Sequence, residues 1–246
     1  MIKQSFLFLP KISYKKELKI KKQVKDWDDF LNTKKIKGIS DINKRLYDKV
    51  IIEAKNALLN NDSSFFLGKL KHKDNWLLYD YFKEESIFLD IEVSKINGFL
   101  TLIGLFDGYE TKIMINDINF DISFLKNYLK NFKLIITFNG SVFDLPFLEK
   151  KYHGLLPNVP NIDVRHLCQK LNLKGSLKEI ELKLGIKREN PVIERLYSGD
   201  PYKLWKTYKA TGNKYYLDLL IEYNEEDIIN LKKILDLCLE KLKFNY

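Results

Sequence analysis

The sequence has little cysteine, little histidine and no long apolar run. Its 246 residues include two cysteines and three histidines. Two cysteines are too few for a disulfide framework, and Cys168 and Cys238 lie on apolar helix patterns, so we expect buried free thiols. His72, His153 and His166 do not have the spacing of a zinc site.

Segments that direct a chain into or across a membrane are also missing. No run approaches the roughly 20 apolar residues that span a bilayer, and the start, MIKQSFLFLPKIS, has no long apolar stretch with a small-residue cleavage site. We therefore expect a cytoplasmic protein with no membrane partner. The composition, with 45% hydrophobic residues, suits one large globular domain or a catalytic domain with a smaller appendage.

Positive charge is concentrated in the first third of the chain. The net charge is +9, and residues 1–80 hold 18 Lys/Arg against 10 Asp/Glu, whereas residues 81–246 hold 24 against 23. Such a lysine-rich region can release counterions from a phosphate backbone; a solvated lysine-rich surface is the alternative. The shift predicts a boundary near residue 80, with a basic N-terminal region at 1–80, a candidate for nucleic-acid binding, and a second domain at 81–246.

The N-terminal region is predicted to be small and mainly helical. Ser5–Leu9 suggests a short strand, and Asp26–Leu31 and Asp41–Leu59 suggest helices. Ser40 or Asp41 would cap the second helix. Its predicted buried stripe has a spacing of four residues and comprises Ile42, Leu46, Val50, Ala54 and Leu58.

Strands and helices alternate beyond residue 80. Strands are predicted at Ile87–Val93, Phe99–Phe106, Glu110–Ile115 and Leu134–Phe138. Helices are predicted at Ile122–Asn131, from Ser141, and at Val164–Leu171, Leu177–Leu184, Pro201–Ala210 and Tyr215–Leu242. This order is typical of an α/β sheet with helices on both faces.

Two acids interrupt the first of these strands. In SIFLDIEV, at 86–93, Asp90 and Glu92 are two residues apart. Side chains alternate along a strand, so these carboxylates point to the same face, about 6–7 Å apart. An edge strand that turns both acids to solvent is the structural alternative.

A third acid follows another strand. In ITFNGSVFDLPFLEKKY, at 136–152, Asn139 and Gly140 turn the chain and Asp144 lies in the first turn of a helix. Loops at the carboxyl ends of strands are where α/β proteins commonly place their sites. The alternative is a capping box in which Ser141 and Asp144 satisfy backbone donors.

The C-terminal helix adds a tyrosine and a fourth acid. The predicted apolar stripe of this helix comprises Leu220, Leu231, Leu235, Cys238 and Leu242. In YNEED, Tyr223 and Asp227 are four residues apart and lie along the margin of that stripe, whereas Glu225 and Glu226 fall away from it. A core tyrosine beside a peripheral acid is the alternative.

Four converging carboxylates would need compensating positive charge. Oxygen ligands favour Mg²⁺ or Mn²⁺ over zinc. Two such cations, about 3.5–4 Å apart, would stabilise the attacking and leaving oxygens of a phosphoryl displacement. The sequence thus predicts two Mg²⁺ or Mn²⁺ ions, held by Asp90, Glu92, Asp144 and Asp227.

Three stretches of this sequence resemble the three successive motifs of the DEDD-type 3′→5′ exonucleases, which belong to the ribonuclease H-like superfamily. They are FLDIEV, TFNGSVFDLPFL and YNEED, and Tyr223 in the last matches the tyrosine of the DEDDy subclass. NIDVRHL at 161–167 and GSLKEIELKLGI at 175–186 are similar to the YprB-like branch, as are WDDFL and NWLLYDYF upstream. The resemblance implies a ribonuclease H-like central mixed sheet of about five strands, with helices on both faces.

The same resemblance implies catalytic roles for the motif residues. Asp90 would bridge the two metals, Glu92 and Asp227 would hold the metal that activates water, and Asp144 would support the second metal. Tyr223 would orient the attacking water.

Four further residues are candidates for substrate contacts. Asn139 and Phe143 would shape the pocket for the terminal nucleotide, by the same resemblance. Trp205 and Tyr208 lie among lysines and could stack on bases, with packing at helical spacing as the alternative.

Three functions stay open at this point. The first is a metal-dependent 3′→5′ exonuclease that releases nucleoside 5′-monophosphates from single-stranded nucleic acid, with DNA favoured over RNA. The second is a structure-specific endonuclease of the same fold, and the third is a non-catalytic nucleic-acid-binding module. No protein partner is implied.

Overall fold

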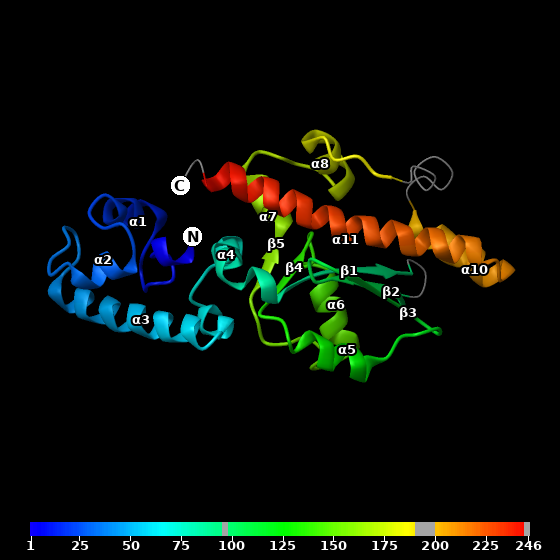
Figure 1. Ribbon diagram of the computed structural model, residues 1–246, viewed down its shortest axis with the longest axis horizontal. Helices are drawn as coiled ribbons and strands as arrows, with labels where there is room; N and C mark the ends of the chain where they lie inside the picture. Colours follow the sequence, from blue (N-terminus) through cyan, green and yellow to red (C-terminus); the bar gives the residue numbers. More distant parts are fainter. Residues whose placement is uncertain (95–97, 190–199, 244–246) are drawn as a thin grey trace.

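A computed structural model describes residues 1–94, 98–189 and 200–243 of the chain (Figure 1). Five strands form one sheet in the order β3-β2-β1-β4-β5. They are β1 (Ser86–Val93), β2 (Leu100–Phe106), β3 (Thr111–Ile115), β4 (Leu134–Thr137) and β5 (Asn161–Asp163). β2 is antiparallel to both β1 and β3, whereas β4 is parallel to β1 and β5. The predicted mixed sheet is therefore confirmed.

Four α-helices precede the sheet in the chain, and later helices lie on both of its faces (Figure 1). The α-helices are α1 (Tyr14–Lys21), α2 (Trp27–Asn32), α3 (Asp41–Leu59), α4 (Tyr79–Phe82), α5 (Ile122–Leu129), α6 (Asp144–Lys151), α7 (Val164–Lys170), α8 (Leu177–Leu184), α10 (Pro201–Thr211) and α11 (Lys214–Lys243). Short 3₁₀ helices are η1 (Ile2–Gln4), η2 (Ser63–Phe66), η3 (His72–Leu78) and η4 (Lys83–Glu85). In the described parts of the chain, none of the helices combines the length and the apolar character that a membrane span requires.

β5 was not among the strands predicted from the sequence pattern. It has three residues, which are too few to show the alternation of a strand. The four longer strands lie within a residue or so of their predicted ends. The helix predicted from Ser141 begins later, at Asp144.

β1 separates two apolar cores. Leu89 and Ile91 pack against α5 and α6 on one face of the sheet, and Phe88 packs on the other face in the cluster that includes α11. Because side chains alternate along a strand, Asp90 and Glu92 share the face of Phe88. The strand therefore directs both acids towards α11.

α11 is a long helix that crosses this second face (Figure 1). Its predicted apolar stripe is buried and comprises Leu220, Leu231, Leu235, Cys238 and Leu242. The sulfur of Cys238 lies 3.9 Å from that of Cys168 on α7. Both cysteines are buried and free, as predicted.

The N-terminal region shares an apolar core with the sheet. Phe6 and Ile51 belong to one continuous cluster with Leu235 of α11. The side-chain amide of Asn75 in η3 donates a hydrogen bond of 2.9 Å to the carbonyl oxygen of Asn161 in β5. The domain boundary near residue 80 stays a prediction, since a shared core can join two domains or belong to one.

The strand predicted at Ser5–Leu9 is wrong, because this segment forms turns. The N–H of Phe6 donates to the buried carboxylate of Glu17 at 2.7 Å, and the N–H of Leu9 donates to the carbonyl oxygen of Phe6 at 3.1 Å. A side chain and a turn thus satisfy backbone groups that a strand would pair with a neighbour.

The buried face of α3 also differs from the prediction. The helix begins at Asp41 and is capped by Ser40, as expected. However, Ile42 is 74% exposed and Leu46 is 43% exposed. Residues spaced by four drift about 40° per step around a helix, so the predicted stripe winds from solvent to core. The buried face includes Tyr47, Ile51, Ala54 and Leu58.

Two substitutions on α3 test this face. We expect Ile51→Ala to lower the free energy of unfolding by about 2–5 kcal/mol, because it opens a cavity in the core. Ile42→Ala removes the same atoms from an exposed position, so it should change the free energy of unfolding by about 0.5 kcal/mol or less. Urea denaturation followed by circular dichroism measures both, and equal effects would contradict the assigned face.

Candidate metal centre

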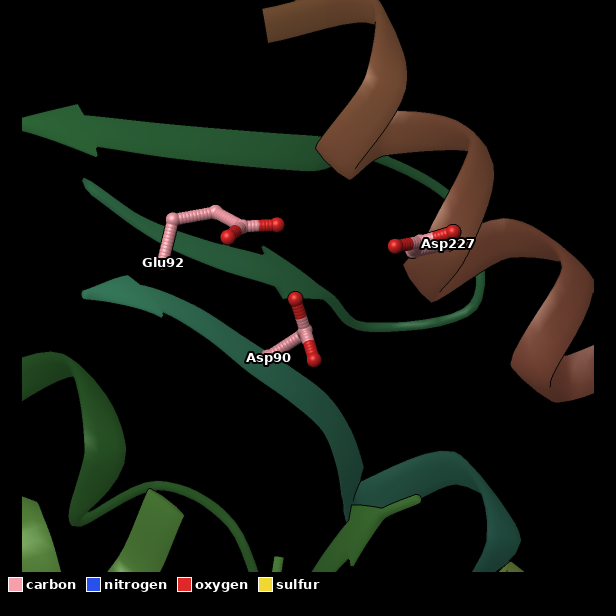
Figure 2. A group of neighbouring side chains, drawn as sticks. All are labelled: Asp90, Glu92 and Asp227. Atoms are coloured by element: carbon pink, nitrogen blue, oxygen red, sulfur yellow. The ribbon is translucent and has the colours of Figure 1, made fainter. Parts of the chain in front are cut away.

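Three carboxylates from β1 and α11 lie together (Figure 2). One oxygen each from Asp90, Glu92 and Asp227 lies within 4.8 Å of the other two. Figure 2 shows the two acids of β1 reaching towards Asp227 on the facing side of the helix. Asp227 is buried, and the other two are partly buried. The structure thus brings together the acids of the first and last sequence motifs.

The sheet becomes irregular immediately after the second acid. Glu92 pairs with Leu102, but Val93 pairs with Leu100, which leaves Thr101 as an extra residue. The Thr101 hydroxyl donates to the carbonyl oxygen of Glu92 at 2.8 Å. Bulges of this kind bend a strand and are frequent beside functional sites. The sequence pattern gave no sign of this one.

Asp144 approaches β1 from the first residue of α6. Its Oδ1 accepts a hydrogen bond of 3.2 Å from the N–H of Ile91, which lies beyond the part of β1 that pairs with β4. The capping-box alternative is wrong, because Phe143 is the N-cap and no side chain caps the helix. The Ser141 hydroxyl instead donates to Asp163 at 2.5 Å.

Asp163, at the end of β5, holds the loop that precedes α6. Its buried carboxylate accepts from the N–H of Asn139 at 2.8 Å and from the Ser141 hydroxyl. Asn139 has a φ of 60°, which asparagine tolerates better than most residues. A Cβ at Gly140 would lie 2.5 Å from that of Thr137, so the turn needs glycine. The segment NIDVRHL contains Asp163, but its sequence did not predict that this residue holds the loop before α6.

A pocket of about 490 Å³ opens beside two of the acids. Its lining comprises Asp90, Ile91, Phe138, Asn139, Phe143, Asp144, Arg165, Gly175, Ser176 and Leu177. Phe143 is 50% exposed, and the Asn139 side-chain oxygen accepts from Arg165 at 2.7 Å. The two residues predicted to contact the terminal nucleotide therefore line one pocket, together with Arg165, which lies in the NIDVRHL segment but was assigned no role from the sequence.

The other two predicted substrate residues pack together on α10. Trp205 is 2% exposed and belongs to a cluster with Leu102 and Leu220. Tyr208 packs against the same cluster, with its ring centroid 5.8 Å from that of Trp205. A base cannot stack on a ring buried in this way, so the packing alternative applies to Trp205. Stacking on Tyr208 stays a prediction.

Tyr223 lies one turn before Asp227 on α11 and is 8% exposed. The ammonium of Lys178 is 4.7 Å from its ring centroid, and the guanidinium carbon of Arg188 is 5.4 Å away. Burial raises the pKa of the Tyr223 hydroxyl far above its ordinary value, and the charges of Asp227 and Glu92 raise it further. The hydroxyl therefore keeps its proton at neutral pH and can donate a hydrogen bond.

Arg188 is held beside Asp227 by a buried acid. Its guanidinium donates to Asp227, and donates to Glu181 of α8 at 2.7 and 3.0 Å. Burial opposes its charge, but these two carboxylates hold the pKa of Arg188 above its ordinary value. Sequence reasoning assigned the compensating charge to metal ions and missed Arg188, which lies outside every motif.

Negative charge still exceeds positive charge at the centre. Burial, followed by the neighbouring acids, raises the pKa values of Asp90 and Glu92 well above their ordinary values. Burial also raises the pKa values of Asp144 and Asp227 to about 6, although Arg188 opposes the rise at Asp227. Among the described residues, the cations beside these acids, Arg188 and Lys178, are fewer than four ionised carboxylates require.

The donor set fits hard divalent cations. Asp90, Glu92 and Asp227 offer only carboxylate oxygens, which Mg²⁺ and Mn²⁺ prefer and which a structural zinc site seldom uses alone. A divalent cation would also supply the missing positive charge. These acids could therefore bind a metal ion, with Asp144 close by.

Comparison with known families places this site in a known fold. A family model described as the RNase_H superfamily matches residues 87–239, more than half of the chain. The chain belongs to the RNase H superfamily. The predicted ribonuclease H-like fold is thereby confirmed, and the matched span contains every acid of the centre. Members of this superfamily are typically nucleases, and the fold implies a nucleic-acid substrate in general.

Among solved structures, the chain is similar to a family B DNA polymerase from the hyperthermophilic archaeon Pyrobaculum calidifontis. The identity is 16% over 64% of this chain, with a TM-score of 0.45, and the match spans 24% of the polymerase chain. A search of curated proteins found no match. Assignment to the DEDDy exonucleases and their YprB-like branch stays a prediction.

The raised pKa of Asp144 predicts a stabilising substitution. With an ordinary value of 3.8 and a folded value of about 6, Asp144 ionises in the unfolded chain first, so the metal-free fold loses stability as pH rises from about 4 to about 6. Asp144→Asn removes the charge and keeps an acceptor for Ile91. We expect it to raise the free energy of unfolding by about 2–3 kcal/mol above pH 6 and by little at pH 4.

Urea denaturation in EDTA between pH 4 and pH 8 measures this difference. Asp218→Asn, which replaces an exposed acid of α11, is the matched control and should not raise the free energy of unfolding by this amount. Excess Mg²⁺ should cancel the advantage of the variant, because binding stabilises the wild type. A gain that is equal at all pH values would contradict the explanation.

Proposed function

We propose that this chain is a divalent-metal-dependent 3′→5′ exonuclease that shortens single-stranded DNA and releases nucleoside 5′-monophosphates. The observation that carries the proposal is the group of Asp90, Glu92 and Asp227, within 4.8 Å of one another in an RNase H superfamily chain. The direction of cleavage follows from the resemblance of the three motifs to those of DEDDy exonucleases.

The acids of β1, α6 and α11 would hold the metal ions. Asp90, Glu92 and Asp227 supply the oxygens that would bind two Mg²⁺ or Mn²⁺ ions, and Asp144 would support the second ion. Bound ions of this kind lower the pKa of an attacking water and stabilise charge on the leaving oxygen. Tyr223 keeps its proton and would orient that water by donating a hydrogen bond.

The pocket beside Asp90 would receive the 3′-terminal nucleotide. Its volume of about 490 Å³ lies within the usual range for small-ligand sites, about 300–1,000 Å³. Phe143, which lines this pocket and is half exposed, offers a ring on which a base can stack. Arg165, which also holds the Asn139 side chain, brings a guanidinium suited to a phosphate.

Removal of a metal ligand tests the proposal directly. We expect Asp90→Ala and Asp227→Ala to lower the rate of DNA hydrolysis by at least about 100-fold, equivalent to about 2.7 kcal/mol of transition-state stabilisation. The measurement is a gel time course of a 5′-labelled single-stranded DNA and an RNA of the same sequence, with Mg²⁺, Mn²⁺ or EDTA. Asp218→Ala, an exposed acid on the same helix, should retain full activity.

The products separate the proposed exonuclease from its alternatives. A ladder that shortens from the 3′ end, with no attack on a circular single strand, supports the exonuclease. Cleavage of the circle would identify an endonuclease instead. Binding without cleavage of any strand would identify a nucleic-acid-binding module, and faster cleavage of RNA would reverse the expected preference.

Tyr223→Phe tests the hydroxyl separately from the ring. The ring packs in the core and should be retained, whereas one hydrogen-bond donor at the reacting water is lost. We expect kcat to fall about 100-fold, as for other donors that act in a transition state, with KM and Mn²⁺ affinity unchanged. Steady-state kinetics and calorimetry measure these quantities, and an unchanged kcat would exclude the role.

A further inference from the structure

A buried amide lies behind the acids of the metal centre. Asn224, between Tyr223 and Asp227 on α11, is 0% exposed. Its Nδ2 donates to Oδ2 of Asp90 at 2.8 Å. Its own Oδ1 is buried without a hydrogen-bond partner among the described residues. An unsatisfied buried oxygen costs free energy and calls for an explanation, so the contact with Asp90 must bring a benefit.

The strand next to β1 makes room for this amide. Gly104 of β2 lies directly opposite Asp90 in the ladder. A Cβ at Gly104 would lie 1.7 Å from Oδ1 and 2.8 Å from Cγ of Asn224, closer than such atoms approach. The backbone of Gly104 lies outside the left-handed region, so its conformation does not require glycine. Because glycine weakens the interior of a strand, the space that it leaves is the remaining reason for it.

We propose that Asn224 is a positioning residue for the Asp90 carboxylate, and that Gly104 provides the space in which the amide sits. This inference rests on the proposed function, because it assigns to Asp90 a partner that holds it ready for a metal ion. Outer partners of metal ligands fix the orientation of those ligands in the same way.

The chemistry of an amide suits this position. A carboxylate has about four acceptor positions on its two oxygens, so one hydrogen bond to Asp90 restricts its rotation and leaves acceptor positions for a cation. The amide is also neutral. It therefore adds no charge that would repel a divalent ion, in contrast to Arg188, whose guanidinium pairs with Asp227.

Calorimetric titration of the metal-free 246-residue chain with MnCl₂ tests the proposal. We expect Asn224→Ala to weaken Mn²⁺ binding about 10- to 100-fold, as substitutions of outer partners commonly do. Gly104→Ala should weaken Mn²⁺ binding by a similar factor, because the new Cβ displaces the Asn224 amide. The double variant should bind no more weakly than Asn224→Ala alone, since the new Cβ then occupies space that the amide has left.

Two further variants separate positioning from folding. Asn224→Leu keeps most of the side-chain volume, and it replaces Asn224→Ala if that variant unfolds. Asn75→Ala removes another buried amide that donates to a carbonyl oxygen, in η3 rather than on β1 or α11. It should lower the melting temperature but leave Mn²⁺ affinity unchanged.

Each result supports or overturns the inference. Mn²⁺ affinity within about twofold of wild type in the Asn224 variants, or in Gly104→Ala, would overturn it, and so would additive effects in the double variant. A wild type that binds Mn²⁺ and cleaves DNA, beside variants that bind equally well, would leave the proposed function standing without this inference. A wild type that binds no Mn²⁺ would overturn both this inference and the proposed function.

Discussion

The repulsion between like-charged carboxylates is the constraint on which this structure depends. Asp90, Glu92 and Asp227 come within 4.8 Å of one another, and partial burial weakens the screening that water would provide. Strand geometry places only the first two. The third acid stays in place because α11 buries an apolar stripe, which includes Leu231 and Leu235, in the core of the molecule. Hydrophobic burial thus offsets a repulsion that bound cations would relieve.

Three of the four acids are each restrained by a donor of a different kind. A backbone N–H restrains Asp144, a guanidinium restrains Asp227 and a buried amide restrains Asp90. These contacts orient the carboxylates, and of the three donors the guanidinium alone is charged, so it offsets part of the charge of Asp227. A centre that is rigid and still negative is suited to divalent cations, and this is a physical reason for a buried strand to carry two acids.

Local periodicity explains what could be predicted from the sequence and where prediction failed. Alternation along β1 and the apolar stripe of α11 each involve one element, and both were confirmed. The predicted stripe of α3 failed because a spacing of four does not stay on one face of a helix. Two interpretations, the capping box with Asp144 and base stacking on Trp205, failed because each depends on a neighbour from another part of the chain. Ile91 of β1 bonds Asp144, and the cluster around α10 buries Trp205.

The α/β alternation, the order of the three motifs and the acid types that favour hard metal ions can all be read from the residues alone. These properties are local or chemical, so the residues alone carry them. Only the tertiary structure decided that Arg188 pairs with Asp227, that Asp163 holds the loop before α6, and that Gly104 leaves room for Asn224. Those contacts join residues far apart in the chain, and no spacing in the sequence encodes their proximity.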